Sequence, residues 1–407
     1  MKKLLQINVI ANSLSTGRIA EGIGQAAIDN NWESYIAYGR WACPSKSQLI
    51  KIGNRCDYYS HFLQTRLLDN HGLSSVNSTK KFLKTVDRIQ PDIIHLHNIH
   101  GYYINYRILF DYLSEKKTPV VWTLHDCWSI TGHCTYFDMV DCNKWETGCY
   151  NCVHGYLYPR CLFGNRSRKN FEMKKDSFTS VDKMIIVPVS DWLGKYVERS
   201  FLGKYPVKVI HNGIDLKDFS PAELSEQNEI KKSLGISPEV KVIVGVAKSF
   251  GKRKGFAEFL KLSTILPSDY IIIMVGVSDD EIKQLPSNVI GIKRTENLHN
   301  LSILYSLADV FINPTLEDNY PTTNLEAMAC GTPVITYNVG GSPEAVTHET
   351  GNVIEKGDVE GLAKAIYDIC SNSNLYSVKC RERALKYFGR EDRYKEYLDL
   401  YNELLNM

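Results

Sequence analysis

Short apolar, β-branched runs alternate along the chain with longer segments of helical periodicity. In the first half, the runs cover residues 4–11, 35–38, 92–97, 120–125 and 183–189. In the second half, they cover residues 207–211, 241–247, 270–276, 288–292, 310–313, 333–336 and 351–354. Continuous apolar strands that alternate with helices are typical of parallel sheets covered on both faces. The pattern therefore predicts an α/β chain with doubly wound parallel sheets.

The runs after residue 200 are too many to extend the first sheet, so we expect two doubly wound domains. Residues 201–206 include Gly203 and Pro206, which are typical of a linker. The domains are therefore expected at 1–203 and 204–385, followed by a helix at 386–407 that packs back on the first domain. Ligands of open parallel sheets bind beyond the carboxyl ends of the strands. Two such domains facing each other would hold the active site in the cleft between them.

The charges of the chain nearly balance. Its 407 residues include 48 Lys and Arg against 46 Asp and Glu, a net charge of +2, which argues against nucleic-acid binding through a global basic field. Gln6 and Asn8 interrupt the first apolar run, which therefore predicts a buried strand rather than a secretion signal. No stretch approaches the roughly 18 apolar residues of a spanning helix. We expect a cytoplasmic protein, at most associated with the inner face of the membrane, whose cysteines stay reduced.

The most specific segment is residues 313–335, which read NPTLEDNYPTTNLEAMACGTPVI. Pro321 is well placed to begin a helix that ends at Gly331. The N-terminus of a helix attracts anions because its unpaired N–H groups and its dipole point outward. Asp318 precedes this helix and Glu326 lies within it, so both carboxylates can line one wall of a site. Taken alone, such a pair also fits two solvated acids at a helix edge.

This segment resembles the C-terminal-domain signature of the retaining glycosyltransferases of family 4, which have the GT-B fold of two Rossmann-like domains. In that signature an acid is followed by seven residues, a Glu and then Ala-Met-Ala-Cys-Gly-Thr-Pro-Val, a spacing that Asp318 and Glu326 match. Glu317 lies one residue too early, yet Glu is common at the first position, so either Glu317 or Asp318 would contact the sugar. The resemblance implies that the first acid meets the donor hexose and that Glu326 holds the ribose hydroxyls. It further implies that loop N–H groups bind sugar or phosphate oxygens, namely those of Asn319, Tyr320 and Thr322.

Two cations follow the strand predicted at 241–247. Lys248 and Lys254 are six residues apart at its carboxyl end, and Arg253 lies beside the second. Charge-assisted hydrogen bonds from such a pair suit a diphosphate and would stabilise it as a leaving group. The family places cations at the corresponding positions, although a solvated basic loop would also fit the pattern.

The first domain carries weaker matches to the same family. Gly17 and Arg18 follow the first strand, where the resemblance implies a turn against the donor phosphate. His125 ends the fourth predicted strand, where the family often places a His beside the reacting sugar. Residues 91–97 and 211–215 resemble the family's mid-domain strand and the turn that opens its second domain. Together these matches follow the expected order along most of the chain.

The glycines Gly22 and Gly24 superficially fit the G-x-G-x-x-A fingerprint of dinucleotide-binding proteins. That fingerprint should follow a strand directly, and ten residues separate Ala11 from Gly22. We therefore interpret both glycines as sites of close packing within the first helix.

Eleven cysteines occur in the chain, and six lie between Cys127 and Cys161 in an irregular insertion at 127–175. Four of them have the spacing C-x7-C-x6-C-x2-C, which is compatible with a tetrahedral structural zinc ion. These four are Cys134, Cys142, Cys149 and Cys152. Other candidate ligands are Cys127, His133, His154 and Cys161, and buried or free thiols are the alternative interpretation.

A basic stretch at 160–175 follows, with six Lys and Arg residues against Glu172. It is either a solvated surface or a weak peripheral contact with anionic lipid. The whole pattern favours a retaining enzyme that moves a hexose from a nucleotide diphosphate sugar to a glycan or lipid-linked saccharide acceptor. The resemblance points to capsule, exopolysaccharide or lipopolysaccharide synthesis, with no cofactor for catalysis. The alternatives are an NAD-dependent oxidoreductase and a non-catalytic, zinc-supported module that binds sugar nucleotides.

Overall fold

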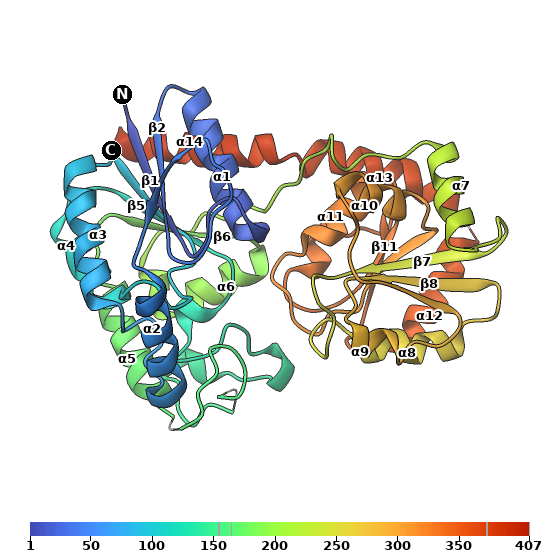
Figure 1. Ribbon diagram of the computed structural model, residues 1–407, viewed down its shortest axis with the longest axis horizontal. Helices are drawn as coiled ribbons and strands as arrows, with labels where there is room; N and C mark the ends of the chain where they lie inside the picture. Colours follow the sequence, from blue (N-terminus) through green and yellow to red (C-terminus); the bar gives the residue numbers. More distant parts are fainter. Residues whose placement is uncertain (154, 164, 372, 407) are drawn as a thin grey trace. The chain divides into compact units, whose positions relative to one another are not determined.

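The computed structural model describes residues 1–153, 155–163, 165–371 and 373–406 (Figure 1). The chain forms two compact units. Unit 1 comprises Met1–His211 together with Glu391–Met407, and unit 2 comprises Asn212–Arg390. In the described part of the chain, no helix is both long enough and apolar enough to cross a membrane.

Unit 1 is built on a six-stranded parallel sheet with the order β3-β2-β1-β4-β5-β6. Its strands are β1 (Lys3–Asn8), β2 (Glu33–Tyr38), β3 (Gln48–Lys51), β4 (Ile93–Leu96), β5 (Val120–Leu124) and β6 (Met184–Pro188). Its helices are α1 (Leu14–Asp29), α2 (Arg55–Leu68), α3 (Val76–Ile89), α4 (Tyr106–Glu115), α5 (Ser167–Phe178), α6 (Asp191–Arg199) and α14 (Arg390–Leu405).

Both faces of this sheet are buried. Leu4 and Val121 pack in one apolar cluster with residues of α1 and α14. Their chain neighbours Leu5 and Trp122 pack in another cluster, with residues of α3, α4, α5 and α6. Because successive side chains of a strand point to opposite faces, a strand covered on both sides must be apolar throughout. This explains the continuous runs in the sequence.

Unit 2 repeats the arrangement with the strand order β12-β11-β10-β7-β8-β9, again fully parallel. Its strands are β7 (Lys241–Val246), β8 (Tyr270–Val275), β9 (Val289–Ile292), β10 (Val310–Asn313), β11 (Val334–Tyr337) and β12 (Gly351–Ile354). Its helices are α7 (Leu224–Ser233), α8 (Phe256–Ile265), α9 (Asp279–Ile282), α10 (Leu298–Ser306), α11 (Thr322–Ala329), α12 (Val359–Cys370) and α13 (Ser373–Tyr387). Numbered within its own unit, each sheet has the order 3-2-1-4-5-6 of doubly wound dinucleotide-binding folds. The predicted fold class is confirmed.

Two details of the sheets differ from the sequence-based expectation. The run at 207–211 does not join the second sheet, because Lys208 N–H donates to Ile186 O (3.0 Å) and Ile210 N–H to Pro188 O (3.1 Å). This segment therefore extends unit 1 alongside β6. Along the chain, unit 1 ends at His211 and unit 2 begins at Asn212, whereas the sequence placed this boundary between residues 203 and 204. The edge strand β3 was not predicted, because its mostly exposed residues lack an apolar run.

Helix α14 is anchored to the first sheet by buried hydrogen bonds. Tyr401 Oη lies 2.6 Å from His95 Nδ1, and His95 Nε2 lies 2.8 Å from Thr123 Oγ1. Thr123 Oγ1 in turn donates to Tyr397 Oη at 3.1 Å. A Cβ on Gly22 would approach the Tyr394 ring to 2.2 Å, and one on Gly24 would approach Ser47 Oγ to 2.4 Å. The interpretation of both glycines as packing sites in α1 is confirmed.

The insertion at 127–175 contains three short 3₁₀ turns, Trp128–Ile130, Asp138–Val140 and Lys144–Glu146, and then the start of α5. Lys174 of α5 is buried beneath it and donates to Trp128 O (2.6 Å) and Thr131 O (2.9 Å). Its amine also lies 3.6 Å from the centroid of the Trp128 ring. Lys174 therefore supports the insertion and is not part of an exposed basic surface.

We predict that Tyr401→Phe destabilises unit 1 by roughly 1–3 kcal/mol, because it leaves a buried nitrogen of His95 without its hydrogen bond. All six tryptophans lie between residues 32 and 192, so tryptophan fluorescence during urea unfolding reports on unit 1. Tyr387→Phe, at an exposed position of α13, is the matched control and should leave the transition unchanged. Equal unfolding midpoints for wild type and Tyr401→Phe would contradict the anchoring role.

Candidate active site

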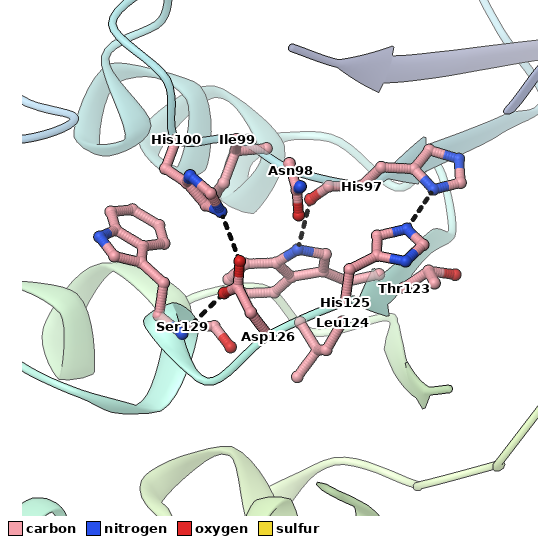
Figure 2. A pocket seen from close by; sticks show the side chains of 11 residues that line it. His97, Asn98, Ile99, His100, Thr123, Leu124, His125, Asp126 and Ser129 are labelled. Atoms are coloured by element: carbon pink, nitrogen blue, oxygen red, sulfur yellow. Dashed lines mark hydrogen bonds and ion pairs between the residues drawn. The ribbon is translucent and has the colours of Figure 1, made fainter. Parts of the chain in front are cut away.

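The carboxyl ends of β4 and β5 border a pocket in unit 1 (Figure 2). Its lining comes from the last residues of β5 and from the segments that directly follow β4 and β5, which are neighbours in the sheet. Asn98, His100, His125, Asp126 and Ser129 are among the residues that line it. Polar side chains thus gather where parallel strands end, the place at which such sheets bind ligands.

His125 stands in this pocket in a fixed orientation. Its Nε2 lies 3.2 Å from His97 Nδ1 (Figure 2). On its other side, His97 Nε2 lies 3.0 Å from Gln6 Oε1 on β1. Burial lowers the pKa of His125 to about 4, although the Asp126 carboxylate opposes this effect. The imidazole is therefore neutral at pH 7, which suits a hydrogen-bonding partner better than a general acid.

A second polar pair lines the same pocket. His100 Nε2 lies 3.0 Å from Asp126 Oδ2, and Trp128 N–H donates to Asp126 Oδ1 at 2.9 Å (Figure 2). Burial opposes ionisation of Asp126, but His100 and the hydrogen bonds outweigh it and hold the pKa of this carboxyl below its usual value. Asp126 is thus an oriented carboxylate directly beside His125.

Gly17 and Arg18 lie elsewhere in unit 1 than expected. The sequence placed them in a turn before the first helix, but α1 already begins at Leu14, so both lie within its early turns. Gly17 is buried and its carbonyl accepts from Asn12 N–H at 3.1 Å, whereas Arg18 is exposed.

In unit 2, the loops after β7 and β10 meet. Lys254 Nζ forms an ion pair with Asp318 Oδ2, and Arg253 donates through Nη1 to Glu317 O at 2.8 Å. Burial opposes ionisation of Asp318, but the charges of Lys254 and Arg253 outweigh it and lower the pKa of this carboxyl. The Glu317 side chain is buried, and the neighbouring Asp318 forms the ion pair with Lys254. Lys248 is exposed two residues beyond β7.

Two glycines permit this close approach of backbones. Gly255 has φ +74°, and a Cβ there would lie 2.2 Å from Pro314 O. Gly340 has φ +56°, and its Cβ would lie 1.7 Å from Asp318 O. A side chain at either position would push the loops apart, so both glycines help to hold Asp318 against Lys254.

Helix α11 positions the second acid of the motif. Its first residue, Thr322, follows Pro321, and Gly331 with φ +82° lies just beyond its end, as the sequence predicts. Tyr305 Oη of α10 donates to Glu326 Oε2 at 2.9 Å, which orients that half-buried carboxylate. Tyr320 is buried immediately before the helix. Asn319 N–H donates to Asp318 Oδ1 at 3.0 Å and so supports the first acid of the pair.

The cysteines predicted as metal ligands all lie in unit 1 and line a separate pocket under the insertion, together with His133. Two of the other candidates lie away from its lining. Cys127 is packed in the main core, and Cys161 Sγ donates to Phe163 O at 3.1 Å. His154 lies outside the described residues.

Comparison with known families covers nearly the whole chain. Residues 18–218 match the family description Glycosyltransferase Family 4, and residues 226–387 match Glycosyl transferases group 1. The two matches fall almost entirely on different units, each with its own doubly wound sheet. The chain belongs to the glycosyltransferases, because both matches are to glycosyltransferase families. It is thus a glycosyltransferase with the GT-B fold.

Individual relatives agree with this assignment over their full length. The Escherichia coli (strain K12) protein named as colanic acid biosynthesis glycosyl transferase WcaC is 23% identical over 421 residues, covering 98% of this chain and 100% of its own. Sucrose-phosphate synthase from Thermosynechococcus elongatus has a TM-score of 0.75 at 17% identity, and both chains are fully covered. HepE from Anabaena, solved in complex with UDP, has a TM-score of 0.68 at 14% identity, covering 99% of this chain and 100% of its own.

Sequence reasoning missed several residues that shape the unit 1 pocket and the ion-paired loops of unit 2. His97, His100 and Asp126 line the pocket or orient its residues, and Tyr305 orients Glu326. A signal was available for the histidines, because residues that end adjacent parallel strands must lie side by side. Tyr305 gave no such signal, since its contact with Glu326 depends on how α10 packs against α11.

We predict that unit 1 of this glycosyltransferase loses stability as the pH falls below about 6.5. The pKa values of His61 and His125, about 3 and about 4, are lowered by burial, and burial also lowers those of His71, His95 and His97. The unfolded chain therefore binds protons that the folded unit excludes, and the free energy of unfolding decreases from pH 6.5 toward pH 4. Urea unfolding followed by tryptophan fluorescence at pH 7 and pH 5 measures this loss.

His125→Gln should make the loss between pH 7 and pH 5 smaller, because it removes one of the groups that takes up a proton on unfolding. The matched control is His348→Gln at an exposed position of unit 2, which should leave the fluorescence transition unchanged at both pH values. A wild-type midpoint that does not change between pH 7 and pH 5 would refute the prediction.

Proposed function

We propose that this glycosyltransferase moves a hexose from a nucleotide diphosphate sugar to a saccharide or lipid-linked saccharide acceptor, with retention of the anomeric configuration. The observation that carries the proposal is the Lys254–Asp318 ion pair beside the N-terminus of α11. It joins a cation suited to a diphosphate with a carboxylate suited to a sugar hydroxyl. The name of the WcaC relative supports a role in capsule, exopolysaccharide or lipopolysaccharide synthesis, and UDP in HepE supports a nucleotide donor.

We assign the binding of the donor diphosphate to the side chains of Lys248, Lys254 and Arg18. In the reaction, the bond between the anomeric carbon and the diphosphate oxygen breaks, and its electron pair stays on that oxygen. The acceptor hydroxyl bonds to the anomeric carbon on the same face, and its proton passes to the departing diphosphate. Cations held at the leaving oxygen stabilise the transition state more than the bound donor, because negative charge develops on that oxygen as the bond breaks. No metal ion is needed for this role.

The carboxylates orient the rest of the donor. Asp318 accepts a hydrogen bond from a hydroxyl of the hexose, while Lys254 and Asn319 hold it in place. Glu326, fixed by Tyr305, accepts from the ribose hydroxyls. The backbone N–H groups of Tyr320 and Thr322, at the start of α11, donate to sugar or phosphate oxygens. Both carboxylates are held in position before the donor binds, so little entropy is lost in orienting them, which favours binding in one pose.

His125 of unit 1 is assigned to a hydroxyl of the reacting sugar. Its neutral imidazole is anchored through His97 and serves as a hydrogen-bonding partner rather than as the nucleophile. Gly17 is assigned to close approach of the backbone to the donor phosphate. Weak peripheral attraction to anionic lipid is assigned to exposed cations of the insertion and α5, namely Arg160, Arg168, Lys169 and Lys175.

A panel of nucleotide sugars and dinucleotides read by thermal shift tests the donor assignment on the full chain. Stabilisation by one nucleotide diphosphate sugar, with none by NAD or NADP, is the expected result. The configuration of the product, read by NMR coupling constants at the anomeric proton, tests retention. Donor hydrolysis without acceptor distinguishes an enzyme from a non-catalytic binding module. A chain that binds only dinucleotides, or that binds a donor without turnover, would overturn the proposal.

We predict that Lys254→Ala and Glu326→Ala each lower kcat/KM for the donor by roughly 100-fold or more, since each removes a preorganised partner of the donor. Both positions are partly exposed, so the fold should persist. Lys261→Ala and Glu360→Ala, at surface positions of α8 and α12, are matched controls that should retain wild-type kinetics. Near-native turnover in either test variant would contradict the assigned roles.

A further inference from the structure

The insertion of unit 1 encloses a pocket that the proposed transfer reaction does not use. All four cysteines of the C-x7-C-x6-C-x2-C pattern line it, beside the rings of Phe137 and Trp145. None of the four forms a disulfide. They lie in the segments that follow the three 3₁₀ turns, so the fold, rather than sequence proximity alone, gathers the thiols.

Polar groups around the thiols have the arrangement expected next to a metal. Gly132 N–H donates to Cys149 Sγ at 3.1 Å. His133 lines the same pocket, and its Nδ1 lies 2.9 Å from Asp69 Oδ1. Its Nε2 is buried with no hydrogen-bond partner in the described part of the chain. A buried nitrogen without a partner is costly unless a ligand satisfies it or the site is built around one.

Two lysines supply positive charge to this pocket. Lys144 lines it and donates to Tyr150 O (3.2 Å) and Asn151 O (3.3 Å), which fixes the turn between Cys149 and Cys152. Buried Lys174 interacts electrostatically with Cys149 and Cys134. Four thiolates around a divalent ion leave a net negative site, and burying such a charge requires nearby cations. Thiols that stay protonated have no such requirement.

We propose that Cys134, Cys142, Cys149 and Cys152 hold a structural zinc ion. Thiolate ligands in tetrahedral geometry select zinc, and a site closed by four protein ligands leaves no position for a reacting water. No three of these sulfur atoms lie within 4.8 Å of one another in the described residues. Zinc–sulfur bonds of about 2.3 Å would therefore draw the thiols toward a common centre. The ion would cross-link three parts of a long irregular segment.

Metal analysis of the purified full chain, prepared without a metal-chelating tag, tests the proposal. The expected result is about one zinc ion per chain. Cys142→Ser, at a half-buried position, should reduce the zinc content to background. Cys161→Ser is the matched control from the same insertion and should keep the full content, because its sulfur lies outside the pocket lining. Zinc removal by a chelator should lower the unfolding midpoint read by tryptophan fluorescence.

Cobalt substitution identifies the ligands without a variant. Intense thiolate-to-cobalt charge transfer with the visible bands of a tetrahedral four-sulfur site is the supporting outcome. A three-sulfur, one-nitrogen spectrum would bring His133 into the set and overturn the assigned ligands. A chain that is isolated without zinc and is equally stable with and without added zinc would overturn the site itself. None of these readouts uses turnover, so they are independent of the proposed transfer reaction.

Discussion

Parallel strand pairing places every carboxyl end of a sheet at one edge, and both units depend on this constraint. The strands are buried on both faces, so their side chains form the core. Polar side chains that could bind a ligand therefore come mainly from the segments that follow the strands. In unit 1, the segments after β4 and β5 bring His125 and His97 together. In unit 2, those after β7 and β10 bring Lys254 to Asp318. The same architecture thus supplies a neutral hydrogen-bonding surface in one unit and a charged one in the other.

The difference between the two edges follows from solvation. Burial lowers the pKa of His125 and outweighs the opposing effect of the Asp126 carboxylate beside it, so the imidazole remains neutral. Asp318 is also largely shielded, yet two cations lie beside it and the carboxylate keeps its charge. Burial alone would neutralise both groups, so the balance between burial and the neighbouring opposite charges decides each case.

Most of the architecture could be predicted from the sequence, because a strand buried on both faces must be a continuous apolar run. The prediction failed where this rule does not apply. The edge strand β3 has few buried residues, and the 207–211 run is apolar because it lies beside β6, not because it starts a new sheet. The acids Asp318 and Glu326 were predicted from their spacing around a helix start and from the resemblance of that spacing to a family motif. Tyr305 and Gly340 were not, because their roles depend on contacts between elements far apart in sequence.

Helix α14 has a consequence for the order in which this molecule can fold. The chain leaves unit 1 at residue 211, builds all of unit 2, and only then returns with Tyr397 and Tyr401. During synthesis, residues 1–211 are therefore made before α14. Until α14 has been made, the apolar surface that it covers stays exposed, and His95 and Thr123 lack their tyrosine partners. Unit 2 has no such dependence and can complete its core as soon as residue 390 has emerged. The first unit to be made is thus the last to be finished.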